Sequence, residues 1–262
     1  MRLRDKVILI TASTRGIGLA IAEACAREGG VVWMAARDLK RAQAIASRID
    51  PGGSRVHCVW NDAERPETFL SMVEETVRTS GRIDVLVNNF GASDPGRDLD
   101  LARTDPAYFL DTVRVNLRSV FLASQAAARH MAAQGGGSII NISSVAGSVP
   151  DVSRIAYGVS KAAIDHLTRL IAVQEAHHRI RCNAIAPGMT ATEAVSQNLS
   201  GDFRARFLAC VPLGRIGLPE EIASAVVHFA SDESTYTTGQ ILTVSGGFGL
   251  ATPLYGAMSG PE

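Results

Sequence analysis

Short apolar segments alternate with longer segments in which apolar positions recur every three or four residues. This pattern predicts β-strands and α-helices in turn. The predicted strands are Lys6–Thr11, Val31–Ala36, Val56–Trp60, Ile83–Asn88, Ser138–Ile142, Arg181–Ala186 and Gln240–Val244. The predicted helices are Ile17–Glu28, Leu39–Ile49, Glu64–Thr79, Asp105–Ala133, Ile155–Ala176 and Pro219–Ala230. The alternation is typical of βαβ units, and the nearly continuous apolar strands favour a parallel sheet that is buried on both faces.

No long linker rich in proline, glycine or serine divides the 262 residues, and their number suits one doubly wound sheet. We therefore predict a single α/β domain of Rossmann type over residues 1–262, with about seven parallel strands and helices on both faces. The alternation of predicted strands and helices weakens between Met189 and Val211. This segment (189–211) is expected to be either a substrate lid or an ordinary helical excursion that only packs.

Composition narrows the class of protein. The chain has 26 basic and 26 acidic residues, so no charged face for nucleic acid is expected. Its apolar runs are far shorter than the ~20 residues of a membrane-spanning helix. The four cysteines are widely scattered, which fits neither a metal site nor a disulfide scaffold. We expect a cytoplasmic protein with reduced thiols and no bound metal.

A glycine-containing turn joins the first predicted strand to the first predicted helix. Here glycine lets the backbone approach a pyrophosphate, and the amide groups at the helix N-terminus attract its charge. The turn therefore predicts a dinucleotide site, whose expected cofactor-binding residues are Ser13, Thr14, Arg15, Gly16, Ile17 and Gly18.

The end of the second predicted strand indicates which nicotinamide cofactor is bound. A carboxylate at this point would bind the ribose 2′-hydroxyl and repel a 2′-phosphate, but the chain has Ala36 followed by Arg37. The guanidinium groups of Arg37 and Arg15 suit a phosphate dianion. We predict NADP(H) in preference to NAD(H), and Asp38 is the feature that favours NAD(H).

Three residues in the second half of the chain predict proton transfer. Ser144 follows the fifth predicted strand, and Tyr157 and Lys161 stand one helical turn apart. On one helix face, the ammonium would favour the phenolate form, so that Tyr157 could exchange a proton with a substrate oxygen. Ser144 would bind the same oxygen. A Tyr-x-x-x-Lys pair on its own is more often a packing pair on a helix surface. Here Ser144 after a strand and the glycine turn favour a catalytic role.

These motifs together resemble the short-chain dehydrogenase/reductase family over essentially the whole chain. The other matching residues are Asn88-Asn89-Phe90-Gly91, Asn116 and Pro187-Gly188 followed by Thr192. The resemblance implies hydride transfer between a nicotinamide ring and a secondary alcohol or ketone, in a homotetramer. The chain departs from the usual pattern at Ala12, where the family has glycine, and at Phe90, where alanine is usual.

The same resemblance implies further roles. Asn89 and Gly91 would line the adenosine side, and Asp62 would approach the adenine ring. Asn116 would be a further catalytic residue that holds a water between Lys161 and solvent. The residues expected to border the nicotinamide are Pro187, Gly188 and Thr192, and Tyr157 and Lys161 are also expected to bind the cofactor.

A narrower resemblance concerns the substrate. The stretches Val149–Tyr157 and Ile180–Ala184, and the tail from Gly246 to Tyr255, are similar to bacterial NADP-dependent 7-alpha-hydroxysteroid dehydrogenases. This implies a bile-acid-type steroid as substrate. The apolar tail (246–262) would either cover such a ligand or pack on a neighbouring subunit.

Two other functions are compatible with part of this residue pattern. Another enzyme with the same catalytic set would be a 3-oxoacyl thioester reductase or other carbonyl reductase. A different class would be a non-catalytic sensor of the NADP redox state. Because a sensor needs no proton donor beside the nicotinamide, Ser144, Tyr157 and Lys161 argue against it.

Overall fold

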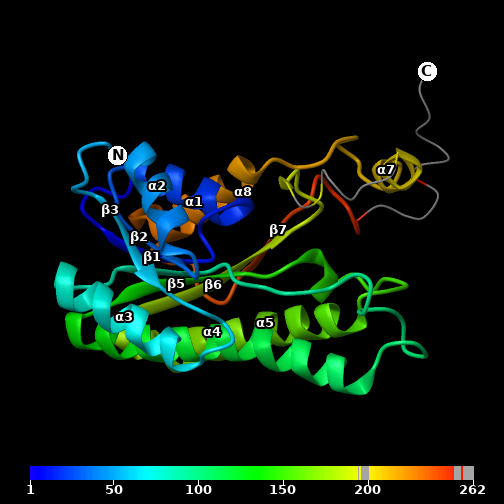
Figure 1. The fold of residues 1–262 in the computed structure, drawn as a ribbon, viewed down its shortest axis with the longest axis horizontal. Coiled ribbons are helices and arrows are strands. Elements are labelled where there is room, and N and C mark those ends of the chain that lie inside the picture. The colour runs from blue at the N-terminus through cyan, green and yellow to red at the C-terminus, as the bar shows by residue number, and fades with distance from the viewer. Residues whose placement is uncertain (194, 196–200, 251–254, 256–262) are drawn as a thin grey trace.

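The computed structural model, which describes residues 1–193, 195, 201–250 and 255, contains one parallel sheet of seven strands (Figure 1). The strand order is β3-β2-β1-β4-β5-β6-β7. The strands are β1 (Val7–Thr11), β2 (Val31–Ala36), β3 (Val56–Trp60), β4 (Val85–Asn88), β5 (Gly137–Ile142), β6 (Ile180–Pro187) and β7 (Ile241–Val244). The predicted fold class is therefore confirmed.

Helices lie on both faces of the sheet. The α-helices with described bounds are α1 (Gly16–Arg27), α2 (Leu39–Ile49), α3 (Glu67–Ser80), α4 (Pro106–Gln134), α5 (Ile155–Gln174), α7 (Gly201–Leu208) and α8 (Pro219–Ala230). Helices α1, α2 and α8 cover one face, and α3, α4 and α5 cover the other (Figure 1). Among the described helices, none has the length and apolar character needed to cross a membrane.

The central strands contribute side chains to two hydrophobic cores, one on each face of the sheet. Ile8 and Ile10 pack with residues of α1 and α8, whereas Val7 and Leu9 pack with residues of α3 and α4. Because successive side chains of a strand point to opposite faces, a strand between two helical layers has to be apolar throughout. The edge strand β7 is only partly buried.

Helix boundaries follow local chemistry. Helices α2 and α4 begin where a carboxylate accepts a backbone hydrogen bond, from Arg41 N to Asp38 at 3.0 Å and from Tyr108 N to Asp105 at 2.9 Å. The predicted start of α3 at Glu64 is wrong by three residues. Pro66 is the N-cap of α3, and a proline disfavours helical backbone in the residue before it.

The described part of the segment predicted as a lid (189–211) includes helix α7, which the sequence did not predict as an element. Residues 194 and 196–200 of this segment lie outside the described residues, as do 251–254 and 256–262 of the predicted tail. Within the described part, the ring of Phe207 on α7 stacks on Phe248 at a centroid distance of 4.9 Å. The lid segment and the tail are therefore in contact.

Candidate active site

The glycine turn lies at the carboxyl end of the sheet, where the strand order reverses. Strands β2 and β3 continue the sheet on one side of β1, and β4 to β7 continue it on the other. The connections that follow β1 and β4 therefore diverge and leave a crevice, which is the usual ligand site of an open parallel sheet.

Side chains from β1 and β4 fix the backbone of this turn. The Asn89 amide donates to the carbonyl oxygens of Thr11 and Ala12, both at 3.1 Å. The Thr11 hydroxyl accepts from Asn89 N at 2.8 Å and from Phe90 N at 3.0 Å. Ala12, which replaces the usual glycine, has a φ of 52°, in the left-handed region that a residue with a Cβ adopts at a cost. The turn therefore keeps a glycine-like backbone, held partly by Asn89.

The start of α1 fits a dinucleotide phosphate. No side chain caps this helix, and its first turn carries no acidic residue, so its amide groups and partial positive charge face outward. A Cβ placed on Gly16 would lie 3.2 Å from Thr192 Cγ2. Thr192, expected beside the nicotinamide, therefore lies against the turn.

The two arginines predicted to bind a 2′-phosphate are both exposed. Within the described residues, neither Arg15 nor Arg37 forms a side-chain hydrogen bond or an ion pair. The carboxylate of Asp38, in contrast, caps α2. Asp62 lies at the end of β3, where its Oδ1 accepts from Glu64 N at 3.1 Å. Arg37 and Asp62, expected beside a 2′-phosphate and an adenine ring, therefore follow the carboxyl ends of the neighbouring strands β2 and β3.

Lys161 and Tyr157 lie together on α5, as the sequence predicts. Lys161 is only 2% exposed, and its Nζ lies 5.4 Å from the centroid of the Tyr157 ring. The ammonium donates to the carbonyl oxygen of Ile142, at the end of β5, at 2.8 Å. Ser144 follows two residues later, where its Oγ accepts from Ala146 N at 3.2 Å. Its hydroxyl proton remains available to a ligand.

Asn116 and Gly91 lie beside this pair. Asn116 is fully buried, and its amide bonds both to the backbone of Ala92, at 2.8 and 2.9 Å, and to Ser160 Oγ at 3.0 Å. It therefore ties α4 to α5 next to Lys161. A Cβ on Gly91 would lie 3.1 Å from Lys161 Nζ. The water that Asn116 is expected to hold stays a prediction.

Pro187 and Gly188 complete the carboxyl edge of the sheet. Pro187 ends β6, and Gly188 N donates to Val244 O at 2.9 Å. A Cβ on Gly188 would lie 2.9 Å from Ser245 Cα, so the ends of β6 and β7 approach closely here. All the predicted site residues lie at or beyond the carboxyl ends of strands or on the helices that follow.

The single carboxyl group on α5, that of Asp165, lies near Lys161. Burial raises the pKa of Asp165, and a hydrogen bond from Ser143 and the charges of Arg169 and Lys161 oppose this rise. An acid with a raised pKa holds its proton more tightly in the folded state. Its contribution to the free energy of unfolding is therefore present at low pH and is lost as the pH rises through its folded pKa.

Two residues near Tyr157 were missed by the sequence argument. The guanidinium carbon of Arg154 lies 4.3 Å from the centroid of the Tyr157 ring, and Asp98 is fully buried at the start of α5. Arg154 could have been found, because it stands just before a predicted helix and three residues before Tyr157. Asp98 carried no signal, since its partners lie 58 and 59 residues away.

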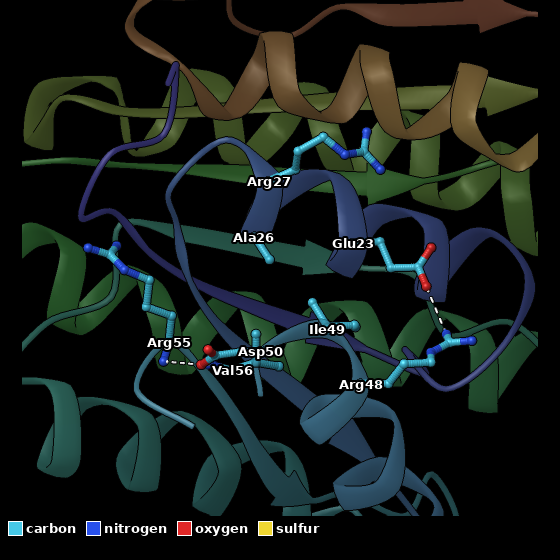
Figure 2. Close-up of a pocket in the computed structure, with 8 residues that line it drawn as sticks. All are labelled: Glu23, Ala26, Arg27, Arg48, Ile49, Asp50, Arg55 and Val56. Atoms are coloured by element: carbon cyan, nitrogen blue, oxygen red, sulfur yellow. Dashed lines mark hydrogen bonds and ion pairs between the residues drawn. The ribbon is translucent and has the colours of Figure 1, made fainter. Parts of the chain in front are cut away.

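A cavity of about 430 Å³ lies elsewhere, at the amino end of β3 (Figure 2). Ala26, Ile49 and Val56 line it with apolar atoms, and two of its charged residues, Glu23 and Arg48, form an ion pair at 2.8 Å. It contains no predicted site residue. We therefore place the candidate active site at the opposite, carboxyl edge of the sheet.

The chain is also similar to known proteins. A family described as "Enoyl-(Acyl carrier protein) reductase" matches residues 11–249. A protein from Clostridium sardiniense named "7alpha-hydroxysteroid dehydrogenase" is 48% identical over 254 residues, which are 97% of each chain. The crystal structure of a short-chain type dehydrogenase/reductase from Mycobacterium marinum superposes with a TM-score of 0.88, at 34% identity, over 95% of this chain and 97% of that one. The chain belongs to the short-chain dehydrogenase/reductase family.

The protein is thus an enzyme of the oxidoreductase class, and the short-chain dehydrogenase/reductase family uses nicotinamide cofactors. Other relatives have different names. A "3-oxoacyl-[acyl-carrier-protein] reductase FabG" from Thermotoga maritima is 38% identical, over 94% of this chain and 99% of its own. Membership in the family therefore determines neither the substrate nor the choice between NAD(H) and NADP(H).

Proposed function

We propose that this enzyme is an NADP-dependent hydroxysteroid dehydrogenase that acts on the 7α-hydroxyl group of a bile-acid-type steroid. The observation that carries the proposal is the 48% identity, along almost the full length of both chains, to a relative with that name. The alternative, a 3-oxoacyl thioester reductase, is supported by a relative of 38% identity. The two activities use the same proton-transfer residues.

Tyr157 is the proposed acid and base. In the oxidation of an alcohol, its phenolate oxygen takes the hydroxyl proton, and in the reverse direction the phenol returns it. NADP supplies the hydride acceptor, and NADPH the hydride donor. The Lys161 ammonium lies 5.4 Å from the centroid of the Tyr157 ring and would attract the negative charge of the phenolate oxygen during proton transfer, and its hydrogen bond to Ile142 O holds it in place. Ser144 donates a hydrogen bond to the same substrate oxygen as charge develops on it.

The preference for NADP(H) rests on charge at the end of β2. Arg15 and Arg37 are two exposed cations without a side-chain partner in the described structure, and Asp38 is engaged as the N-cap of α2. An unpaired guanidinium suits a 2′-phosphate better than a hydroxyl group. The arrangement therefore supports NADP(H).

Replacing Arg37 with alanine is expected to raise the KM for NADP by about 10- to 100-fold, because a hydrogen bond to a charged group contributes about 1.5–3 kcal/mol. The KM for NAD is expected to stay within about 3-fold. Initial-rate measurements with each cofactor test this. Arg27→Ala is the matched control, since Arg27 is exposed, has no side-chain partner among the described residues and lies at the amino edge of the sheet. A wild-type enzyme that clearly prefers NAD would contradict the assignment.

An apolar surface near the site suits a steroid. Phe207 stacks on Phe248, and Leu213 and Leu250 are 66% and 86% exposed. A flat hydrophobic ligand could bury such side chains, as ligand sites are lined mainly by apolar and aromatic groups. We propose that the described parts of the lid (189–211) and the tail (246–262) cover the substrate.

The substrate assignment predicts that NADP is reduced when the enzyme is given a 7α-hydroxylated bile acid. We expect kcat/KM for the 7β epimer to be at least about 100-fold lower, because the hydroxyl would be on the wrong ring face for Tyr157. Absorbance of the reduced cofactor gives the rate. A 3-oxoacyl thioester with NADPH is tested in parallel. Turnover of the thioester alone would favour the carbonyl-reductase alternative, and binding of cofactor without turnover of any substrate would favour the sensor.

We further propose that the enzyme assembles as a homotetramer in the cytoplasm. Exposed apolar side chains lie on the outer layer formed by α4 and α5, including Leu110, Phe121, Leu170 and Val173. Surfaces of this kind are commonly covered in symmetric oligomers. The four unpaired cysteines fit a reducing compartment. Light scattering gives the molar mass that tests the assembly.

A further inference from the structure

The first turn of α5 carries Tyr157 but lacks a cap of its own. Arg154 is the N-cap residue, its side chain makes no capping hydrogen bond, and the first turn contains no acidic residue. A basic side chain is also the wrong charge for the positive end of a helix. The first turn is the part of a helix that frays most readily, because its amide groups have no partner within the helix.

Asp98 supplies the missing cap from another part of the chain. Its Oδ1 accepts from Ala156 N and its Oδ2 from Tyr157 N, both at 2.9 Å. Ser93 Oγ donates to the same Oδ2 at 3.3 Å. The carboxyl group is fully buried, so these bonds compete with no solvent.

The backbone strengthens this connection. Arg154 N donates to Asp98 O at 3.1 Å, and Ile155 N donates to Leu99 O at 3.2 Å. The four consecutive amide groups from Arg154 to Tyr157 are therefore satisfied by two neighbouring residues of the segment between β4 and α4. With φ at 64°, Arg154 turns the chain into the helix, while its guanidinium lies on the Tyr157 ring.

We propose that Asp98 is a positioning residue for Tyr157, which it holds through the backbone amide of Tyr157 itself. This inference rests on the proposed role of Tyr157 as acid and base. Fraying of the first turn would move the phenol oxygen away from the reacting atoms, and a displacement of about 1 Å can cost about 10²-fold in rate. A cap elsewhere on the protein has no such effect, because it holds no reacting group.

Replacing Asp98 with alanine is expected to lower kcat by about 10- to 100-fold, with the KM for NADP changed less than about 3-fold. The glycine turn joins β1 to α1, whereas Asp98 lies between β4 and α4, so the affinity for the cofactor should persist. Amide hydrogen exchange at Ala156 and Tyr157 should become at least about 10-fold faster. Asp98→Asn keeps one acceptor oxygen and should recover part of the lost kcat.

Asp105→Ala is the matched control, because Asp105 caps α4 through one bond of 2.9 Å and touches no site residue. It should lose less thermal stability than Asp98→Ala, because its one capping bond is exposed, and should keep kcat within about 2-fold of the wild type. Steady-state rates are measured with NADP and a 7α-hydroxylated bile acid. A wild-type kcat in Asp98→Ala overturns the inference, and so does an equal loss of kcat in Asp105→Ala.

Different results would contradict the positioning role of Asp98 and the acid and base role of Tyr157. Turnover that survives Tyr157→Phe removes the acid and base role of Tyr157. Loss of turnover in Tyr157→Phe, together with a wild-type kcat in Asp98→Ala, removes only the positioning role of Asp98. If no bile acid is turned over, amide hydrogen exchange still tests whether Asp98 holds the first turn of α5. Unchanged protection of the Ala156 and Tyr157 amides in Asp98→Ala would then overturn the inference.

Discussion

Tyr157→Phe is expected to lower kcat for bile-acid oxidation by about 10²- to 10⁴-fold, the range over which a positioned acid or base accelerates a reaction. The substitution removes the phenol oxygen and keeps the aromatic ring. The contacts of that ring with the Arg154 guanidinium at 4.3 Å and with Lys161 Nζ at 5.4 Å can therefore persist. Cofactor affinity should change little, since the glycine turn joins β1 to α1, whereas Tyr157 lies on α5.

Two measurements separate a chemical effect from a loss of fold. Titration with NADPH gives cofactor affinity, and thermal unfolding gives stability, and both are expected to match the wild type. Tyr236→Phe serves as the matched control, because Tyr236 is fully exposed and lies outside the candidate site. Unchanged turnover in Tyr157→Phe would show that another group transfers the proton.

The role of Tyr157 depends on groups from three separate elements. Lys161 is buried beside it and bonds to the end of β5, and Asp98 bonds to its amide from the segment after β4. Burying a cation is costly unless it is hydrogen-bonded, and the bond to Ile142 O offsets part of this cost. The geometry of the site is thus set by the sheet edge as much as by α5.

Much of the fold could be predicted because the signals are local. All seven predicted strands are found, and the bounds of β2 and β3 match the prediction at both ends. A glycine run follows α4 and leads directly into β5, and Gly135 there has a φ of 94°. Helix α7 was not predicted, because its segment has no clear apolar period.

The candidate site was only partly accessible from the sequence. Tyr157 and Lys161 share one helix, so their spacing alone predicts that they meet. Asn116 bonds to Ser160 and Asp98 to Tyr157 across 44 and 59 residues, and no local pattern encodes such pairs. The same holds for the bonds from Asn89 to the glycine turn, which depend on β1 and β4 being neighbours.

Gly18→Ala is expected to raise the dissociation constant for NADP by about 100-fold or more, because the backbone of the turn would have to move by about 1 Å. The new Cβ would lie 2.4 Å from Ala12 O and 2.5 Å from Asn89 Nδ2. Both atoms belong to the hydrogen bond that holds the turn, so neither can withdraw without breaking it. Overpacking of this kind also lowers the free energy of unfolding by about 1–3 kcal/mol.

Gly52→Ala separates this clash from the general effect of adding a methyl group to a glycine. Gly52 is exposed, and the nearest atom to its added Cβ is Asp50 Oδ1 at 3.5 Å, an ordinary contact distance. We therefore expect cofactor affinity and thermal stability close to those of the wild type. The decisive comparison is a fluorescence titration of both variants with NADPH. Wild-type affinity in Gly18→Ala would contradict this prediction. It would mean that the turn can open without loss of binding, and that the hydrogen bond between Asn89 and Ala12 does not shape the turn for a dinucleotide.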